Sequence, residues 1–386
     1  MANTLTNLTP DLYAALDVVS REMVGLTPAV SRDSSIERAA KDQTVRSAVA
    51  PASSASDITA GQLPADNGDQ TFTNKTITIS KSRYVPVRWT GEEQRGMNTG
   101  EGYNTLLQYQ FQQAMRTLVN EVEADLASLY SSASIAYSPA GTTLFDAASY
   151  KDVANVVKGL NLNGAPLSDR HLVLSPASAA AFRGNATFSS ANTSGDMSML
   201  RQGVLLDQFG MQIRESQQIK SHTAGTAASA TTDATGYAIG ATTLTLDSAG
   251  TGTILAGDVI SITGDASATK YVVVTGDADV SNGGTIVIAA PGLKAALTAA
   301  THAITVDASA ERNMGFSRNA IHLVTRVPAR PAEGDLADDV MIIQDPRSGL
   351  AFEVSLYKEY RRIKYEIALA WGYAMIKPEH CVLLID

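Results

Sequence analysis

The sequence predicts an α+β fold interrupted by an all-β segment, and three observations support this class. Residues 103–130 carry an uninterrupted helical repeat of apolar residues. After residue 141, short helical and strand patterns alternate, and after residue 310 only strand patterns follow. Between these regions, residues 222–309 change to a Thr-, Ala-, Gly- and Asp-rich composition with short apolar runs. Helices and sheets that are segregated in this way are typical of α+β proteins.

The composition indicates a globular protein and excludes several function classes. The chain has 386 residues, of which 44% are hydrophobic and 18% charged, with a net charge of −9. At this length, two or three cores are expected. The negative balance argues against tight, sequence-independent binding of nucleic acid, which needs Lys and Arg. No apolar run approaches a membrane span, and no secretory signal is evident.

The first segment has the pattern of a capped amphipathic helix. Thr9 suits the N-cap, Pro10 the first helical position, and Gly25 follows the end. One apolar stripe results, made of Leu8, Leu12, Leu16, Val19 and Met23. Such a helix needs a surface to lie on. Residues 31–70 show little periodicity, so we expect an extended arm without cohesion of its own, which places the helix against a neighbour or partner.

Residues 71–89 alternate with period two and predict a two-stranded hairpin with its turn at Lys81-Ser82. Pro86 cannot donate to a ladder, so its strand should be an edge. The hairpin carries basic and polar residues and is expected to project from the molecule.

The strongest local signal is the helix predicted over residues 103–130. Its apolar residues step by three and four, without Gly or Pro, through Leu107, Phe111, Met115, Leu118, Val122, Leu126 and Leu129. A helix of this length spans about 40 Å. Because the stripe is one-sided, we expect the helix to lie across a sheet or a neighbouring element.

The regions on either side of residues 222–309 form one α+β host domain. Residues 149–160 predict a helix, residues 171–174 a strand, Ser175-Pro176 the start of a helix through Phe182, and residues 200–216 a helix-to-strand passage at Gly210. Further strands are predicted at residues 321–327, 340–343, 350–357, 362–371 and 382–385.

The intervening segment predicts a small barrel or sandwich inserted into that host. Its strands fall at residues 244–246, 259–262, 271–274, 285–288 and 303–306, divided by Gly-containing turns. Seven Asp and no Glu against two Lys and no Arg give it a charge of −5.

No catalytic, cofactor or metal site emerges from the sequence. The five histidines are scattered, and His171 and His322 lie in strands where a core or surface role is favoured over ligation. The single cysteine, Cys381, lies in the apolar last strand, where burial would raise its pKa and make it inert. Glycines at residues 250–257 precede a strand, so a turn explains them better than a phosphate loop. Asp residues in the insertion are ordinary turn residues.

The run YKEYRRIKYE at residues 357–366 is the one dense basic patch. Its aromatic and basic residues are interleaved as in nucleic-acid sites, but Glu359 and Glu366 dilute them. Three interpretations are open, in order of preference: the polar face of a strand pair, salt bridges between subunits, and contact with DNA.

Three segments carry a resemblance to a known family. They are NLNGAPLSDRHLVLSPASAAAF (residues 161–182), LRQGVLLDQFGMQIRES (residues 200–216) and LAGDVISITG (residues 255–264). The closing AFEVSLYKEYRRIKYEIALAWGYAMIKPEHCVLLI adds to it. Together with the order of elements, the chain resembles the major capsid protein of tailed double-stranded DNA bacteriophages, with the Hong Kong-type fold, and within it the short-tailed-phage coat proteins that carry an inserted β-barrel domain. Each motif is a loose pattern, but the similarity covers nearly the whole chain.

The resemblance implies a division of labour along the chain. Residues 1–70 would be an N-terminal helix and arm that clasps neighbours and meets a scaffolding protein. Residues 71–100 would be the extended loop over an adjacent subunit, and residues 101–145 the spine helix and peripheral domain. Residues 146–221 would form the axial domain, residues 222–309 the inserted β-barrel, and residues 310–386 the return strands of both domains.

The implied function is a non-enzymatic shell. The chain would form hexamers and pentamers of an icosahedral virion capsid, assembled in the host cytoplasm with scaffolding and portal proteins around double-stranded DNA, without a cofactor or membrane. Lys75 and Lys81 lie in the loop, but no Asn and Glu partner for cross-linking is visible. Candidate intersubunit contacts are Leu12, Leu16, Val19, Lys75, Lys81, Arg83, Trp89, Arg361, Arg362 and Lys364.

Two other function classes stay open at this point. A cellular nanocompartment shell of the encapsulin type would share the fold and differ in its neighbouring genes. An adhesion or carbohydrate-binding protein would need exposed aromatics for sugar stacking, and the β-rich segment has only Tyr237 and Tyr271.

Overall fold

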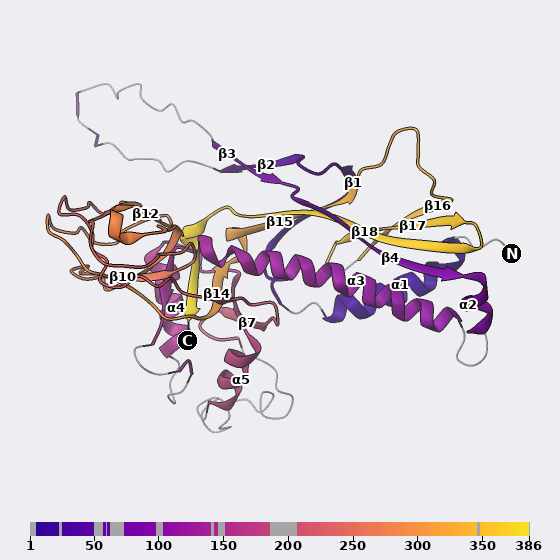
Figure 1. Ribbon diagram of the computed structural model, residues 1–386, viewed down its shortest axis with the longest axis horizontal. Coiled ribbons are helices and arrows are strands. Elements are labelled where there is room, and N and C mark those ends of the chain that lie inside the picture. The colour runs from indigo at the N-terminus through magenta and orange to yellow at the C-terminus, as the bar shows by residue number, and fades with distance from the viewer. Residues whose placement is uncertain are drawn as a thin grey trace.

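The computed structural model shows an elongated molecule with a long helix and sheet at one end and a β-rich unit at the other (Figure 1). It describes residues 5–22, 25–49, 57–58, 60–61, 73–97, 103–139, 143–145, 151–185, 207–345 and 348–385. Helices and strands are both present in the described residues, so the α+β class is confirmed.

A six-stranded sheet forms the first end of the molecule. Its order is β1 (Ser31–Ala39), β15 (Ile321–Pro328), β18 (Arg362–Met375), β17 (Ala351–Glu359) and β16 (Asp339–Gln344), with β4 (Lys81–Thr90) also paired to β18. Strands β1 and β15 are parallel, and the other pairs are antiparallel. Because β17 and β4 pair with the same stretch of β18, they lie on its opposite edges. Strand β4 is therefore an edge strand, as Pro86 predicts.

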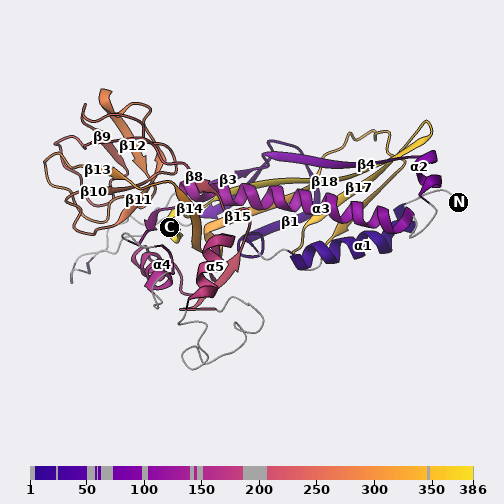
Figure 2. The ribbon, with the colours of Figure 1, turned by 60° about the horizontal axis from the view of Figure 1, so that its bottom comes forward.

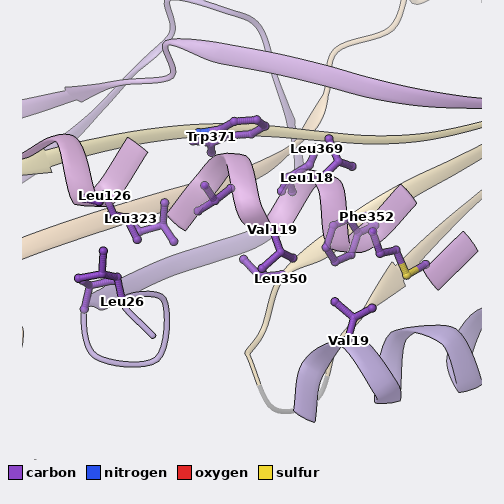
Figure 3. Packing of buried hydrophobic residues seen from close by; sticks show 14 of the residues in the cluster. Val19, Leu26, Leu118, Val119, Leu126, Leu323, Leu350, Phe352, Leu369 and Trp371 are labelled. Atoms are coloured by element: carbon purple, nitrogen blue, oxygen red, sulfur yellow. The ribbon is translucent and has the colours of Figure 1, made fainter. Parts of the chain in front are cut away.

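Helix α3 (Tyr103–Ser128) lies across one face of this sheet, which confirms the spine-like helix expected from periodicity (Figures 1 and 2). Leu118, Val119 and Leu126 of α3 lie in one buried cluster with Leu369 and Trp371 of β18, and Leu118 lies beside Leu369 (Figure 3). Each fully buried side chain of this size contributes about 1.5–3 kcal/mol relative to exposure. A one-sided stripe on a long helix thus becomes the main contact between helix and sheet.

Helix α1 (Leu5–Glu22) packs beside α3 and differs in its start from the prediction. Thr9 is not an N-cap, because the helix begins at Leu5 and contains Pro10. The Thr9 hydroxyl donates to Met341 Sδ at 3.6 Å. Pro10 removes one backbone donor, but the buried stripe of the helix outweighs that loss of one hydrogen bond.

The arm is more ordered than its composition predicts, and the predicted hairpin at residues 71–89 is wrong. Strand β1 joins the large sheet, and β2 (Thr44–Val49) pairs antiparallel with β3 (Thr73–Thr78). Strand β3 therefore pairs with the preceding arm, while β4 pairs with β18. The reason is burial: Val87 and Trp89 of β4 enter the core under α3, which a free hairpin would leave in water. The β2 and β3 strands project from the body (Figure 1).

A second sheet runs from the host domain into the β-rich unit. Its order is β13 (Ile304–Val306), β10 (Val259–Ile262), β11 (Lys270–Thr275), β5 (Ile135–Tyr137), β19 (Cys381–Ile385), β14 (Ala310–Ser317), β6 (Arg170–Leu174) and β7 (Met211–Glu215). Strands β12 (Gly284–Ile288), β9 (Thr243–Leu246) and β8 (Ser221–His222) pair off this path. All five strands predicted in the insertion are confirmed. Pairing of Tyr271 with Ile135 makes the insertion continuous with its host.

Helices α4 (Lys151–Leu162) and α5 (Pro176–Gly184) accompany this sheet. The predicted cap of α5 is confirmed, since Ser175 Oγ accepts from the Ser178 N–H at 3.1 Å. The helical part of the predicted passage at residues 200–206 lies outside the described residues. Strand β7 forms the strand part of that passage. A short helix, α2 (Gly91–Gly96), follows β4.

Polar contacts hold the C-terminal end of α3 to distant segments. The Glu123 carboxylate accepts from the N–H groups of Leu26 and Thr27 at 2.8 and 2.5 Å and from Ser216 Oγ at 3.0 Å. Just after α3, the Tyr130 hydroxyl lies 2.9 Å from His222 Nδ1. These contacts tie the chain after α1, the end of β7 and the start of the insertion to the same helix.

Candidate intersubunit surface

The tip of the β17–β18 hairpin is the most exposed aromatic and basic feature of the first end of the molecule. Tyr360 is 88% exposed, and the guanidinium of Arg361 lies 5.7 Å from its ring centroid. The turn is tight: Arg361 has a φ of 58°, and its carbonyl accepts from the Gly91 N–H at 3.2 Å. Arg362 forms an ion pair with Glu359 across the strands. The backbone of the tip is thus held in one conformation, while the Tyr360 ring remains exposed to solvent.

A groove of about 720 Å³ lies between this tip and the corner where β4 meets α2. Its lining comes from Trp89, Thr90, Gly91, Glu92 and Gln94 on one side and residues 358–363 on the other. A capping box stiffens the α2 wall, because Thr90 Oγ1 accepts from the Glu93 N–H and the Glu93 carboxylate accepts from the Thr90 N–H. These hydrogen bonds lower the pKa of Glu93. The groove is therefore preformed.

Aromatic contacts anchor the groove to the spine helix. Trp89 Nε1 donates to Gln110 Oε1 at 2.7 Å, and its ring meets that of Tyr103 edge-on at 5.3 Å. Tyr365 meets Phe111 in the same manner at 5.4 Å. Burial raises the pKa of both Tyr103 and Tyr365, so their hydroxyls stay neutral at physiological pH. Trp89, a predicted contact residue, thus forms the buried floor of this site.

Lys364, on the opposite face of β18, is already partnered. It forms an ion pair with Glu366 and lies 5.5 Å from the Tyr84 ring and 5.8 Å from the Tyr357 ring. The hydrogen bond with Glu366 raises the pKa of Lys364. Tyr84 is 57% exposed and extends this aromatic patch onto the edge strand. The arrangement matches the preferred interpretation of the basic run, the polar face of a strand pair.

The three basic residues of the predicted loop that were expected to contact a neighbouring subunit instead contact their own chain. Lys81 Nζ lies 2.7 Å from Asp125 Oδ1, and Trp371 Nε1 donates to the other oxygen of that carboxylate at 2.8 Å. Arg83 lies 3.6 Å from Glu121 on α3. Lys75 Nζ donates to the Ile376 carbonyl at 2.6 Å. They hold β3 and β4 to the spine helix and to the end of β18.

The predicted contact residues of the first helix lie in the core of this chain. Leu12, Leu16 and Val19 are at most 1% exposed and pack in the same cluster as α3. The helix therefore finds its surface within the chain, and these side chains are covered. Tyr13 and Val18, which are 45% and 38% exposed, are the large hydrophobic residues that the described part of α1 leaves exposed.

Sequence reasoning missed a buried charge network on the outer face of the sheet. Glu353 of β17 forms ion pairs with Arg38 of β1 at 2.5 Å and with Arg330 at 2.8 Å, and Arg330 also pairs with Asp335. The network holds the loop between β15 and β16, in which Leu336 is 92% exposed. Glu353 alternates with buried apolar neighbours, which is the signal for a polar outer face, but its partners are distant in sequence.

The described residues contain no cluster of three His, Cys, Asp or Glu side chains arranged for a metal ion. Cys381 is fully buried, and burial raises the pKa of its thiol, as expected from its strand. Within the same described part, no helix is both long and apolar enough to cross a bilayer.

Comparisons with known proteins give likenesses only at the level of structure. No protein family and no curated protein sequence matches the chain. A solved structure from Mycobacterium phage Che8 is 15% identical, covering 89% of this chain and 85% of its own, with a TM-score of 0.49. The capsid structure of cyanophage P-SCSP1u is 13% identical, with coverages of 92% and 86% and a TM-score of 0.49. A virus-like particle from Pyrococcus furiosus is 10% identical, with coverages of 97% and 98% and a TM-score of 0.44.

Proposed function

We propose that the chain is a structural shell protein that assembles into an icosahedral capsid around double-stranded phage DNA. The observation that carries the proposal is that the subunit buries its own hydrophobic core and still presents exposed surfaces that the rest of the chain does not cover. These surfaces are the exposed hairpin tip, the preformed groove beside it, and the projecting β2 and β3 strands.

The projecting strands support assembly on physical grounds. A two-stranded ribbon is marginally stable by itself in water. Strands β2 and β3 form such a ribbon, and its main tie to the body is the contact of β3 with the end of β18. A neighbouring subunit would cover the ribbon and supply the missing burial. Repetition of such contacts by symmetry gives a closed shell whose stability comes from their number.

The order of elements supports the capsid form of this proposal. The terminal helix, ordered arm, projecting strands, spine helix, α+β domain with a β-rich insertion, and closing strands follow the order that the sequence resemblance implies. Hexamers and pentamers, a scaffolding protein, a portal protein and assembly in the host cytoplasm come from that resemblance. The net charge of −9 suits a protein that encloses DNA without gripping it over its whole surface.

Substitution at the hairpin tip tests the proposal. Purified full-length protein, with and without a scaffolding protein, is compared with Tyr360→Ser by negative-stain electron microscopy and light scattering. We expect closed shells from the natural protein and weakened assembly from the variant, because an aromatic anchor at an interface is typically worth about 2 kcal/mol or more. Thermal unfolding of the variant subunit should be unchanged, since Tyr360 is 88% exposed.

Ile239→Ser is the matched control, because Ile239 is 69% exposed on the insertion, away from the tip. It should assemble like the natural protein. A natural protein that stays monomeric under every assembly condition would overturn the shell function. Normal assembly of Tyr360→Ser would instead remove the hairpin tip from the interface.

A further inference from the structure

Arg214 and Arg318 lie near His171, and Arg32 lies within electrostatic range of both arginines, without an ion-paired carboxylate in the described part of the chain. Arg32 lies on β1, Arg214 on β7, and Arg318 directly after β14. All three are half-buried, and none forms an ion pair with a described residue. Other arginines of this chain do have such partners, as Arg116 with Glu22 and Arg183 with Glu215 show. In this cluster, three arginines without such an ion pair gather around one another.

Strand register explains why these residues meet. Strands β6 and β7 are parallel, with His171 opposite Gln212 and Val173 opposite Arg214, so His171 and Arg214 share a face. Strand β14 pairs with β6 from the other side and ends at Ser317, which places Arg318 next to His171. An Arg318 terminal nitrogen lies 3.5 Å from His171 Nε2. Strand β1 runs beside β15, with Arg32 opposite Leu323, and brings its guanidinium within electrostatic range of the other two.

Several polar atoms of the cluster are buried without a hydrogen-bond partner. They are Nε of Arg214, Nε of Arg318 and Nδ1 of His171, and His171 is fully buried. Burial, and then the neighbouring guanidiniums, lower the pKa of Arg32 and Arg214. The arrangement therefore costs free energy in the isolated chain, through desolvation and like-charge repulsion.

The carboxylates in electrostatic range do not neutralise this cluster. Asp345, whose charge acts to raise the pKa of Arg32, is 1% exposed, and its carboxylate accepts a hydrogen bond from the Ser348 N–H at 2.9 Å. Asp207 and Asp169 act on Arg214 and His171, but both are exposed to solvent and form no ion pair with them. The cluster retains donor capacity for an added oxyanion.

We propose that Arg32, Arg214 and Arg318 form a binding site for phosphate groups of a nucleic-acid backbone. The guanidinium fork matches phosphate oxygens in bidentate geometry. A single carboxylate from a second subunit could bind only one of the three guanidinium groups. Successive phosphates along a nucleic-acid strand could supply an acceptor for each of the three. The nucleic-acid source rests on the proposed shell function, while phosphate binding itself does not.

Salt-dependent DNA binding tests the site. Unassembled full-length protein is titrated against a short labelled DNA duplex, by fluorescence anisotropy, over a series of chloride concentrations. The triple variant Arg32→Gln, Arg214→Gln, Arg318→Gln should bind more weakly, and the slope of log K against log salt should fall by about 0.9 for each phosphate that the variant no longer binds. The matched control removes three ion-paired arginines, Arg83→Gln, Arg116→Gln and Arg183→Gln, and should keep the natural slope.

Inorganic phosphate distinguishes the sources of the ligand. At constant ionic strength, phosphate in place of chloride should raise the melting temperature of the natural protein and the control but not of the cluster variant. Protection by phosphate together with no duplex binding would overturn the nucleic-acid source. Equal losses in the cluster and control variants would show a general charge effect and overturn the site.

Assembly separates this inference from the shell function. A cluster variant that forms normal shells and loses duplex binding supports the inference. A folded variant that keeps duplex binding but forms no shells would assign the arginines to contact with a second copy and overturn it. If the triple variant does not fold, Arg32→Gln alone is measured, with an expected slope change of about 0.9. If the natural protein forms no shells, only the proposed function and the assignment of the phosphate groups to enclosed DNA are overturned.

Discussion

His171 shows how much a single buried side chain depends on its surroundings. The sequence places it in a strand among apolar residues, and the structure buries it completely on β6. Burial, and then Arg214 and Arg318, lower the pKa of His171 to about 4. An unfolded chain takes up a proton near pH 6.5, whereas the folded chain resists it until about pH 4. Stability from this residue is therefore complete above pH 6.5 and is lost as the pH falls toward 4.

Replacement of His171 by Gln tests this pH dependence. Urea denaturation is measured at several pH values from above 7 to about 4. The natural protein should lose on the order of 3 kcal/mol more stability over this window than His171→Gln, which cannot titrate. His322 and His380, whose pKa values burial also lowers, contribute equally in both proteins. Parallel stability curves for the two proteins would contradict the prediction.

At the scale of helices and strands, residue periodicity predicts which elements form but not which strands pair. The helical stripe of residues 103–130 correctly predicts α3, because hydrophobic spacing along one helix is a local property. The predicted hairpin at residues 71–89 fails, because strand partners depend on distant segments: β3 meets β2, and β4 meets β18. Alternation identified the strands, while burial of Trp89 against α3 decided which edge β4 would join.

The crossing of β18 by the end of β3 yields a prediction at this scale. A Cβ on Gly372 would lie 2.2 Å from the Thr78 carbonyl oxygen and 2.8 Å from its carbon, both backbone atoms. Gly372→Ala should therefore displace β3 and lower the free energy of unfolding by about 1–3 kcal/mol. Chemical denaturation measures this loss.

Gly184→Ala is the control for that experiment. It lies at the end of α5, where an added Cβ meets nothing within 4 Å. Its stability should be unchanged or increased by up to about 1 kcal/mol. An equal loss in both variants, or none in Gly372→Ala, would show that the close approach of β3 to β18 does not constrain the fold.

At the scale of the whole molecule, the β-rich insertion is both a unit and a part of its host. Within the insertion, each strand pairs with the next in the order β9, β12, β11, β10 and β13. Strand β11 also pairs with β5 of the host, and the two regions share one buried cluster. The composition change at residue 222 marks the start of the insertion in the sequence, but nothing in the sequence indicates that one sheet runs from the host into the insertion.

The isolated fragment of residues 222–309 is expected to fold. Its own strands supply buried residues such as Leu244, Ile260 and Ile286, even without the β5 edge. Dispersed amide resonances and cooperative thermal unfolding would check this. The fragment with Ile286→Asp should be unfolded, because it buries an unpaired charge. Random-coil spectra from the natural fragment would show that the host sheet is required.

The sequence by itself determined the α+β class, the spine helix, the strands of the insertion and the final strands, because apolar spacing along a segment reports directly which face is buried. It also determined the inert character of Cys381 through its apolar strand. The tertiary structure alone decided the partner of each strand, the burial of Leu12 and Leu16 against α3, and the meeting of Arg32, Arg214 and Arg318. These depend on contacts between residues that are far apart in the chain, and a single sequence carries no local signal for them.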